Sequence, residues 1–410
     1  MTKPRFVFFA LAPTGSGISG SDRIFIELAR RWSAKYPVTI YITNEGVEMM
    51  KRQRLSGKNL KIVKVGKDKL PENFFLKYFY KIYLGIKLGF FSLSTIYNLP
   101  STILYSSSDF WMDIFPGVIL KLRFNQMKWI ATWYQTAPSP LIGYREQGIR
   151  NKNYFLSAFL YWFSQLIAKP LIGRFADKVI VNNQDEKKEF PKHIKRGDTI
   201  VLLGAVPLED IGNYKQSLAT KGGELRIMNK GFKKEYDAVF LGRFHPQKGV
   251  VELVDIWKKV VDKVPDARLA MIGDGPLRKN VEDRIKNLGL EKNVELFGYL
   301  FDGPKKYKIL SQSKIVVHPA FYDSGGMASA EAMAFGIPAV GFNLKAYDSY
   351  YPKGMIKVPN GNIELFAKEI IDLLENENRR RKIGREAKNM IEMNWSWNNR
   401  AQEILDLIHG

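Results

Sequence analysis

The sequence predicts an α/β protein with two Rossmann-like, doubly wound domains that face each other across a cleft. Short runs rich in Val, Ile and aromatic residues alternate with segments of helical period, as expected of repeated βα units. These runs form two series, separated by a polar, glycine-bearing stretch at residues 207–236. A chain of 410 residues is long enough for two large domains.

Each series predicts its own parallel sheet. The first comprises residues 6–12, 38–43, 102–107, 129–134 and 178–183. The second comprises residues 238–242, 267–273, 294–298, 315–319 and 339–342, and helices are expected at 362–374 and 379–392. We therefore expect domains at 1–206 and 237–392, an interdomain linker at 207–236, and a last helix within 393–410 that packs against either domain.

The composition excludes several classes of protein. Cysteine is absent, which rules out disulfides, iron–sulfur clusters and thiol nucleophiles. Four scattered histidines show no metal-ligand spacing. The apolar, charge-free stretch at residues 153–168 is shorter than the ~20 residues that span a bilayer, and the N-terminal apolar run fits a buried strand better than a signal peptide. We expect a cytoplasmic protein without a metal.

The charge balance calls for an anionic partner. Lys and Arg number 63 against 41 Asp and Glu, a net charge of +22. No nucleic-acid-binding motif is present, so nucleic acid is not expected. Residues 74–97 and 154–172 are rich in aromatic side chains, and Lys77, Lys81 and Lys87 share one edge of the first segment if it is helical. Two interpretations stay open: a buried helix with a lysine edge, or docking on an anionic membrane surface.

A glycine-rich loop follows the first predicted strand. Gly15, Gly17 and Gly20 form a G-x-G-x-x-G pattern ahead of a helix, where backbone amides can approach an anion. Glu45 follows the second strand, where a dinucleotide-binding domain places its ribose-binding acid. Alone, these residues would indicate an NAD-dependent oxidoreductase, although any glycine-rich βα turn gives the same pattern.

The second series opens with a basic loop. Arg243 and Lys248 stand five residues apart directly after a strand, and the pair suits a diphosphate because Arg forks onto phosphate oxygens while Lys adds a point charge. Gly273, and Gly298 before Tyr299, mark two further strand exits where the backbone approaches a flat or bulky group. A basic surface loop and ordinary tight turns explain the same residues.

The most specific pattern runs from His318 to Pro338. A strand ends, Asp323 follows, Gly325 and Gly326 open a helix, and Glu331 comes eight residues after the first acid. Free amides at the start of that helix can hold an anion. The two carboxylates fit neutral vicinal hydroxyls, as in ribose or hexose.

Together these motifs resemble the retaining glycosyltransferases of family 4, which have the GT-B fold. The resemblance rests on G-R-x-x-x-x-K-G, G-x-G-P, F-G and acid-x7-Glu-Ala-Met-Ala-x-Gly-x-Pro in this order, over residues 237–400. It extends loosely to the first half and to the W-S-W tail helix, which in that family crosses back to the N-terminal domain. It implies transfer of a hexose from a nucleotide diphosphate sugar with retention, and without a metal or other cofactor.

The resemblance also assigns roles to single positions. It implies binding of the donor diphosphate by Arg243, Lys248, Gly17, Gly326, Met327 and Ala328, and binding of the ribose by Glu331. It also implies binding of the donor sugar by Asp323 and Gly325, and a nucleobase region at Gly273, Tyr299 and Leu300. Asp323 stands where the family has glutamate. Where many relatives carry a histidine near the reacting sugar, this chain has Tyr134 and Gln135. Tyr134, with Asp323, is the catalytic candidate, or else it caps the sheet.

The expected function is a cytoplasmic hexosyltransferase with a glycan, polyprenyl-phosphate or glycolipid acceptor, placed peripherally on the inner face of the cell membrane. A sugar-nucleotide or glycan-binding module without turnover is the main alternative, because the histidine is missing. An NAD-dependent oxidoreductase is the third. The chain has no D-x-D, the metal-binding motif of the other major transferase fold. No motif fixes the donor base, the sugar or the linkage.

Overall fold

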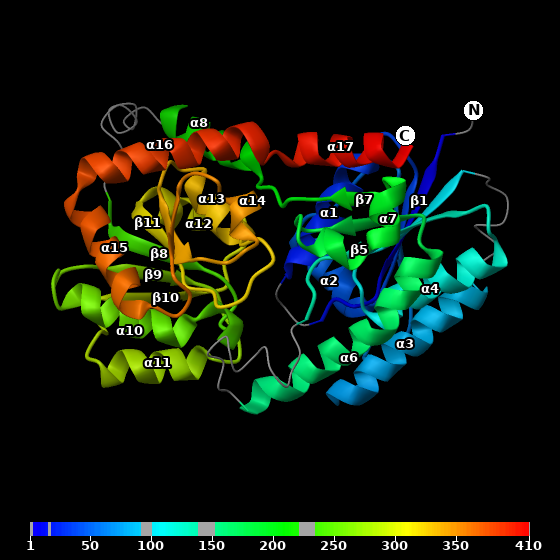
Figure 1. Ribbon diagram of the computed structural model, residues 1–410, viewed down its shortest axis with the longest axis horizontal. Helices are drawn as coiled ribbons and strands as arrows, with labels where there is room; N and C mark the ends of the chain where they lie inside the picture. Colours follow the sequence, from blue (N-terminus) through cyan, green and yellow to red (C-terminus); the bar gives the residue numbers. More distant parts are fainter. Residues whose placement is uncertain (1–2, 15–17, 92–100, 138–151, 221–233, 410) are drawn as a thin grey trace. The chain divides into compact units, whose positions relative to one another are not determined.

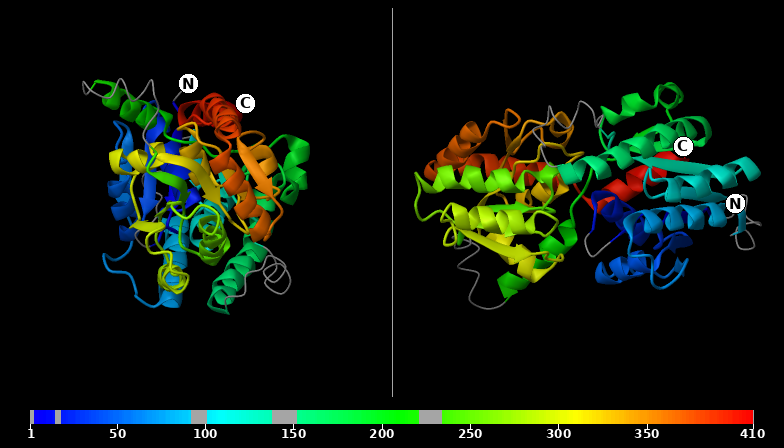
Figure 2. Two further views of the ribbon diagram at one scale, coloured as in Figure 1. Left: turned by 90° about the vertical axis from the view of Figure 1, so that its left-hand side faces the viewer. Right: turned by 90° about the horizontal axis from the view of Figure 1, so that it is seen from below.

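The computed structural model describes residues 3–14, 18–91, 101–137, 152–220 and 234–409. They form two compact units, each built on a parallel sheet with helices on both faces (Figures 1 and 2). The first unit falls within Met1–Pro140, Phe155–Leu202 and Asn398–Gly410, and the second takes in Leu203–Trp397. This architecture confirms the predicted fold class.

The first unit contains a parallel sheet of seven strands. In their order across the sheet they are β3 (Leu60–Lys64), β2 (Val38–Ile42), β1 (Arg5–Ala10), β4 (Thr102–Ser106), β5 (Lys128–Trp133), β6 (Lys178–Val181) and β7 (Thr199–Val201). Its helices are α1 (Gly20–Trp32), α2 (Asn44–Arg52), α3 (Phe74–Phe91), α4 (Trp111–Arg123), α6 (Lys152–Phe175), η2 (Glu186–Glu189), α7 (Pro191–Arg196) and α17 (Trp397–His409).

The centre of this sheet is buried on both faces. Phe8 of β1 pairs in register with Ile40 of β2 and Tyr105 of β4, and all three side chains are inaccessible to solvent. A central parallel strand covered by helices is expected to be apolar on both faces. The apolar run at the N-terminus is therefore explained as the central strand of the sheet.

The C-terminal helix α17 belongs to the first unit. Trp32 of α1 donates its indole N–H to the carbonyl of Ala401 at 3.0 Å, and Arg31 Nε donates to Asn398 Oδ1 at 2.6 Å. The buried Trp397, at the start of α17, is 1% exposed. The chain thus returns to its N-terminal unit after completing the second one.

The second unit contains a parallel sheet of six strands. In order they are β10 (Val294–Gly298), β9 (Leu269–Ile272), β8 (Tyr236–Leu241), β11 (Ser313–His318), β12 (Ala339–Phe342) and β13 (Met355–Val358). Its helices are α8 (Leu208–Thr220), η3 (Pro246–Lys248), α10 (Val250–Val261), α11 (Arg278–Asn287), α12 (Pro304–Ser311), α13 (Met327–Met333), α14 (Tyr347–Tyr350), α15 (Ile363–Glu375) and α16 (Glu377–Asn394).

The stretch 207–236 corrects one expectation. It was predicted to be a linker without a sustained period, but α8 occupies its first half and packs on the second unit through the buried side chain of Ile211. The polar composition is that of a surface helix with one apolar stripe. Residues 221–233 lie outside the described residues.

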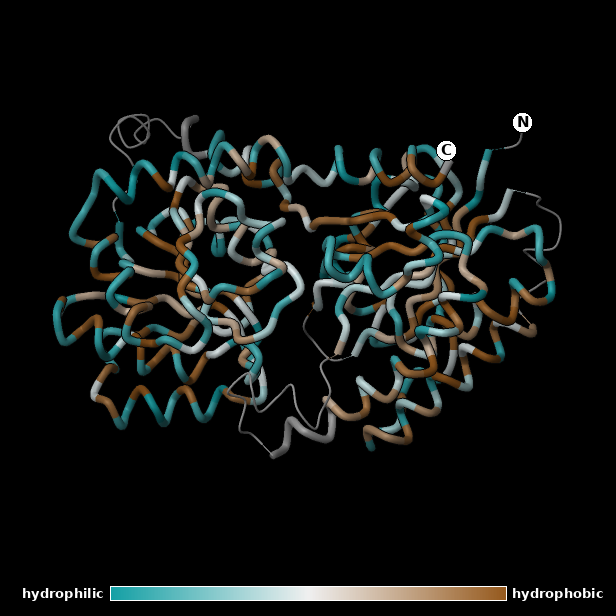
Figure 3. Tube along the Cα trace, in the orientation of Figure 1, coloured by the Kyte–Doolittle hydropathy of each residue, from teal (hydrophilic) through white to brown (hydrophobic). Residues whose placement is uncertain are grey.

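The lysine edge predicted for residues 74–97 also differs from the structure. Lys81 of α3 is buried and Lys77 is partly buried, whereas Lys87 is exposed. Large apolar side chains point outward from α3. Figure 3 colours much of α3 and α6 brown, the colour of hydrophobic residues. In the described part of the chain, no helix has both the length and the apolarity needed to cross a bilayer.

Candidate functional site

The predicted site residues of the second unit gather at the carboxyl edge of its sheet. They lie on the loops that follow β8, β9, β10 and β11, and at the start of α13. In doubly wound sheets ligands bind at this edge, because the loops that leave the strands converge there.

The loop after β8 carries the two cations. Arg243 is exposed, and Lys248 closes the short helix η3. The next residue, Gly249, adopts a left-handed conformation with φ of 62°, and a Cβ there would lie 2.1 Å from the carbonyl oxygen of Pro319. This close approach of the β8 and β11 loops places the ammonium of Lys248 2.5 Å from Asp323 Oδ2.

Three groups contact the carboxylate of Asp323. Besides Lys248, His318 Nε2 lies 2.9 Å from Oδ2, and the amide of Gly325 donates to Oδ1 at 3.3 Å. Burial alone would raise the pKa of the Asp323 carboxyl, but Lys248 and His318 hold that pKa well below its ordinary value. Burial lowers the pKa of His318, although Asp323 opposes the shift. The carboxylate therefore stays ionised.

These contacts add to the role that the resemblance implies for Asp323. Lys248 and His318 contact Oδ2, and the amide of Gly325 donates to Oδ1. Each carboxylate oxygen can accept a further hydrogen bond. Asp323 therefore positions Lys248 and His318 and stays a candidate for the donor-sugar hydroxyls.

Glu331 forms an ion pair that the sequence did not reveal. It lies on α13 and its carboxylate contacts the ammonium of Lys306 from α12, with each residue only 8% exposed. Lys306 also donates to Asp302 Oδ1 at 3.0 Å. A buried carboxylate is stable only with such a partner. Nothing in the pattern P-K-K-Y-K distinguished Lys306 from its exposed neighbours, so only the fold identifies it.

Backbone conformation and neighbouring tyrosines favour glycine at both positions before α13. A Cβ on Gly325 would lie 2.2 Å from the ring of Tyr350. Gly326 has φ of 59°, and a Cβ there would lie 3.2 Å from the hydroxyl of Tyr347. Met327 and Ala328 then form the partly exposed first turn of α13. Helix-start amides lack intrahelical partners, so these remain candidate donors to an anion.

The predicted nucleobase region lies at the exits of β9 and β10. Gly273 has φ of 150°, and a Cβ there would meet the carbonyl oxygen of Gly242 at 1.8 Å. Close packing of the backbone at the ends of two neighbouring strands therefore explains why this residue is glycine. The sequence had left such a structural explanation open. Tyr299 is 37% exposed and stacks edge-on with Phe301, whose ring centre is 5.0 Å away, while Leu300 is half-buried.

The dinucleotide interpretation of the first unit rests on the glycine-rich loop and on Glu45. Gly17 of that loop lies outside the described residues. Glu45 is bonded by Lys77 at 2.7 Å through Oε1 and by Lys81 at 3.1 Å through Oε2, so its carboxylate joins α2 to α3. Glu45, the acid that suggested a ribose contact, therefore has a structural role. It no longer supports the interpretation as an NAD-dependent oxidoreductase.

Tyr134 is buried at the end of β5. It is 6% exposed, and its hydroxyl lies 2.9 Å from that of Tyr105 in the sheet. Burial raises its pKa well above the ordinary value, so the phenol stays protonated. The geometry favours the alternative role, a residue packed against the sheet, over the catalytic one. The carbonyl of its neighbour Gln135 accepts a hydrogen bond from Gln165 at 2.7 Å.

Two buried carboxylates at the carboxyl edge of the first sheet were not recognised from sequence as a pair. Asp113 accepts from the amide of Leu11 and the hydroxyl of Ser108, both at 2.6 Å, and burial raises its pKa to about 7. Asp109 accepts from Gln165 at 2.6 Å, and burial raises its pKa to about 6. Both acids are held by neutral donors.

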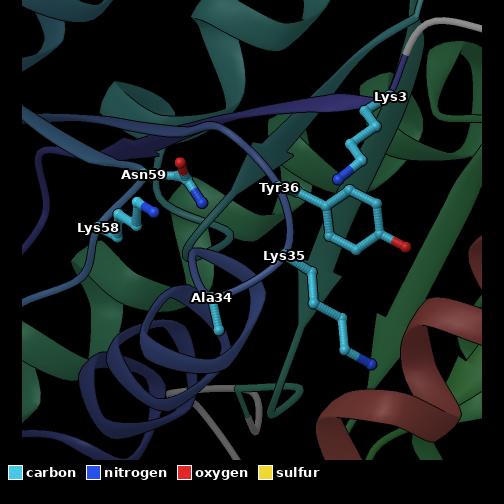
Figure 4. A pocket seen from close by; sticks show the side chains of 6 residues that line it. All are labelled: Lys3, Ala34, Lys35, Tyr36, Lys58 and Asn59. Atoms are coloured by element: carbon cyan, nitrogen blue, oxygen red, sulfur yellow. The ribbon is translucent and has the colours of Figure 1, made fainter.

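A pocket of about 440 Å³ lies elsewhere on the first unit (Figure 4). Its lining residues are Lys3, Ala34, Lys35, Tyr36, Lys58 and Asn59. Lys3 precedes β1 and Asn59 precedes β3, so the pocket sits at the amino edge of the sheet, opposite the edge where ligands bind in this fold. It is not part of the candidate site.

Comparison with known proteins agrees with this geometry. Residues 224–390 match the family model "Glycosyl transferases group 1". Among curated relatives, glycosyltransferase MJ1069 of Methanocaldococcus jannaschii is 24% identical over 94% of this chain and 93% of its own length. Glycosyltransferase MJ1059 of the same organism is 26% identical over 60% of this chain, and poly(ribitol-phosphate) α-N-acetylglucosaminyltransferase of Staphylococcus aureus is 26% identical over 55%. The chain spans about half the length of these last two, 56% and 47%.

Solved structures share the fold over the whole chain. Sucrose-phosphate synthase of Thermosynechococcus elongatus is 17% identical with a TM-score of 0.71, covering 99% of this chain and 98% of its own. HepE of Anabaena, solved with UDP and glucose, is 14% identical with a TM-score of 0.68, covering 99% of both chains. Such low identity establishes the fold alone, which is GT-B. Within this GT-B chain, residues 224–390 are thus similar to the group 1 glycosyl transferases.

Proposed function

We propose that the protein is a retaining family 4 glycosyltransferase that moves a hexose from a nucleoside diphosphate sugar to a glycan or lipid-linked acceptor. The observation that carries this proposal is the loop after β8, which holds Arg243 and Lys248 at the carboxyl edge of the second sheet. The matched family segment, residues 224–390, includes both cations and Glu331. The UDP bound to HepE supports a nucleoside diphosphate donor.

The proposed chemistry is electrostatic. Cleavage of the bond between the anomeric carbon and the diphosphate leaves negative charge on the diphosphate. Arg243 and Lys248 offset that charge, so the proposal invokes no metal. Asp323 keeps Lys248 in place while the site is empty, and a diphosphate, with more charge than one carboxylate, draws the ammonium onto itself.

Glu331 orients the donor in this scheme. Its carboxylate accepts hydrogen bonds from ribose hydroxyls, and Lys306 fixes the carboxylate from behind. Each carboxylate oxygen has two lone pairs, so one ion pair leaves acceptor capacity for the ribose. The acceptor oxygen bonds to the anomeric carbon on the face that the diphosphate leaves, which gives retention. The proton of the acceptor hydroxyl passes to the departing diphosphate oxygen, so no protein base is required.

We further propose that the acceptor is associated with the inner face of the cell membrane, as a polyprenyl-phosphate glycan or glycolipid. Support comes from the exposed apolar side chains of α3 and α6. A polymer-acting relative, the poly(ribitol-phosphate) transferase of Staphylococcus aureus, supports a glycan-like acceptor.

The experiment is a thermal-shift panel of UDP- and GDP-sugars, with NADH for comparison, each with and without EDTA. We expect one nucleotide sugar to raise the melting temperature regardless of EDTA, and NMR of the product formed with that donor to show a retained anomeric configuration. Stabilisation by NADH alone would contradict the proposal. Donor binding without transfer to any acceptor would favour a non-catalytic binding module.

A further inference from the structure

Helix α3 turns charged side chains inward and aromatic side chains outward. Lys81 is 1% exposed and donates to the carbonyl of Pro13 at 2.6 Å as well as to Glu45. The outward stripe is apolar: Leu76 is 63%, Phe79 60% and Tyr83 56% exposed. This is the reverse of an ordinary surface helix, whose polar side faces water.

The inner side of α3 is packed against another helix. A Cβ on Gly85 would lie 2.4 Å from the carbonyl oxygen of Met112, and one on Gly89 would lie 2.8 Å from Ile119, so α3 packs closely on α4. A helix with apolar residues on all sides is normally covered on all sides. The outer side of α3 therefore lacks a cover within the described residues.

Helix α6 extends the same surface. Its exposed apolar side chains follow one helical stripe: Phe159, Phe163, Leu166 and Ile167. Trp111 of α4 joins the two helices, because its ring lies 6.4 Å from that of Tyr78 and 6.0 Å from that of Phe163. Figures 1 and 3 show α3, α4 and α6 side by side and largely apolar. We call the exposed side chains of the two stripes, Leu76, Phe79, Tyr83, Phe159, Phe163, Leu166 and Ile167, the aromatic surface.

The two helices that carry the aromatic surface have only positive charges of their own, although Glu45 and Glu189 of neighbouring helices pair with Lys77 and Lys169. Neither α3 nor α6 contains an Asp or Glu. Lys87 and Arg174, one on each helix, are exposed. Residues 1–206 contain 31 Lys and Arg but only 14 Asp and Glu, so most of the net charge of the chain lies in this half.

We infer that the aromatic surface docks on an anionic lipid bilayer. Aromatic side chains enter the boundary between headgroups and acyl chains, and Lys87 and Arg174 meet lipid phosphates. Exposed apolar side chains gathered on neighbouring helices mark an interaction site, and helices that contain Lys and Arg but no Asp or Glu favour an anionic plane over a neutral protein face. Docking itself does not depend on the proposed transfer reaction; only its purpose, access to a lipid-linked acceptor, rests on it.

The test is sedimentation of the full-length chain with vesicles of phosphatidylcholine, with and without 30% phosphatidylglycerol. We expect binding that requires phosphatidylglycerol and weakens as salt rises. Phe79→Ser with Leu166→Ser should reduce partitioning at least tenfold, and Lys87→Glu with Arg174→Glu should abolish its dependence on phosphatidylglycerol. Met393→Ser with Leu407→Ser, which changes exposed apolar residues on α16 and α17, is the matched control and should bind normally.

All variants are also tested for stabilisation by a nucleotide sugar in solution, which separates the two proposals. Vesicle binding without donor binding would remove the proposed function and leave the docking surface intact. Absence of vesicle binding, equal binding to phosphatidylcholine alone, or full binding by the Phe79→Ser, Leu166→Ser variant would overturn the inference. Oligomerisation that these substitutions abolish, without vesicle binding, would assign the surface to a second copy of the chain.

Discussion

The carboxyl edges of the two sheets carry opposite electrostatic arrangements. On the second sheet, Lys248 and Lys306 pair with Asp323 and Glu331, so cations are available at the edge. On the first sheet, Asp109 and Asp113 are held by amides and hydroxyls. Burial raises the pKa values of these two acids, whereas the pKa of Asp323 is held low. Among the described residues, the second edge therefore suits an anion better than the first.

The largest effect on stability is expected at Asp113. Asp113→Ala leaves the amide of Leu11 and the hydroxyls of Ser107 and Ser108 without their shared acceptor. We expect a loss of about 3 kcal/mol, measured by chemical denaturation. Asp262→Ala, at an exposed ion pair on α10, is the control and should cost under about 0.5 kcal/mol. A comparable cost in both variants would mean that the buried network is not formed.

The acids at the two edges should make the stability of the protein depend on pH in opposite directions. The pKa of Asp113 is raised from 3.8 to about 7, so the folded state binds more protons than the unfolded state between these values, and stability falls as pH rises from about 4 to 7. Asp113→Asn should remove a fall on the order of 4 kcal/mol over that range. The pKa of Asp323 is lowered, so its contribution is present above pH 4 and is lost on acidification below it.

Calorimetry of the parent, Asp113→Asn and Asp323→Asn from pH 3 to pH 8 measures both windows. The Asp113 variant should differ from the parent in slope between pH 4 and pH 7. The Asp323 variant should differ by a constant above pH 5, and the difference should shrink below pH 4. Parallel curves for all three proteins would contradict the contrast between the edges.

A variant of Lys306 tests whether its ion pair with Glu331 contributes to binding at the second edge. Lys306→Met leaves Glu331 without its ion-pair partner and should weaken nucleoside diphosphate binding about tenfold, about 1.4 kcal/mol. The loss should vanish for a 2′,3′-dideoxy analogue, because Lys306 acts through the carboxylate that binds the ribose. Lys308→Met, at an exposed lysine of the same helix, is the control. Calorimetric titration measures both ligands, and an equal loss for the two would assign Lys306 a purely structural role.

The smallest effect is expected at Tyr134. Tyr134→Phe removes one hydrogen bond, to Tyr105, and should cost about 1 kcal/mol of stability. Initial rates with the donor identified in the thermal-shift panel should stay within about twofold, because the phenol is buried and bonded to Tyr105. A tenfold drop in rate in a variant that melts normally would restore Tyr134 as a catalytic residue.

The interior strands were predictable from sequence, whereas of the four edge strands only β10 was, at residues 294–298. Central strands such as β1 and β8 are continuous apolar runs because helices cover both of their faces. The strands that were missed, β3, β7 and β13, all lie at sheet edges. In β3, Lys61 and Lys64 are exposed, so no apolar run marks the strand.

Within the site, motif positions were predictable and their partners were not. Arg243, Lys248 and Glu331 follow from a pattern local in sequence. Lys306 is 25 residues from Glu331, and the fold alone brings the two together. The same holds for Asp113, whose donor Leu11 is 102 residues away.

The most direct test of the central claim is nucleoside diphosphate binding by an Arg243→Ala, Lys248→Ala double variant. With UDP and GDP, calorimetric titration should show that the nucleotide bound by the parent loses at least about a hundredfold in affinity, because two charge-assisted contacts disappear. A Lys258→Ala, Lys259→Ala variant removes the same charge from α10 and should bind as the parent does. A folded double variant with parental affinity would show that the carboxyl edge of the second sheet does not hold the diphosphate.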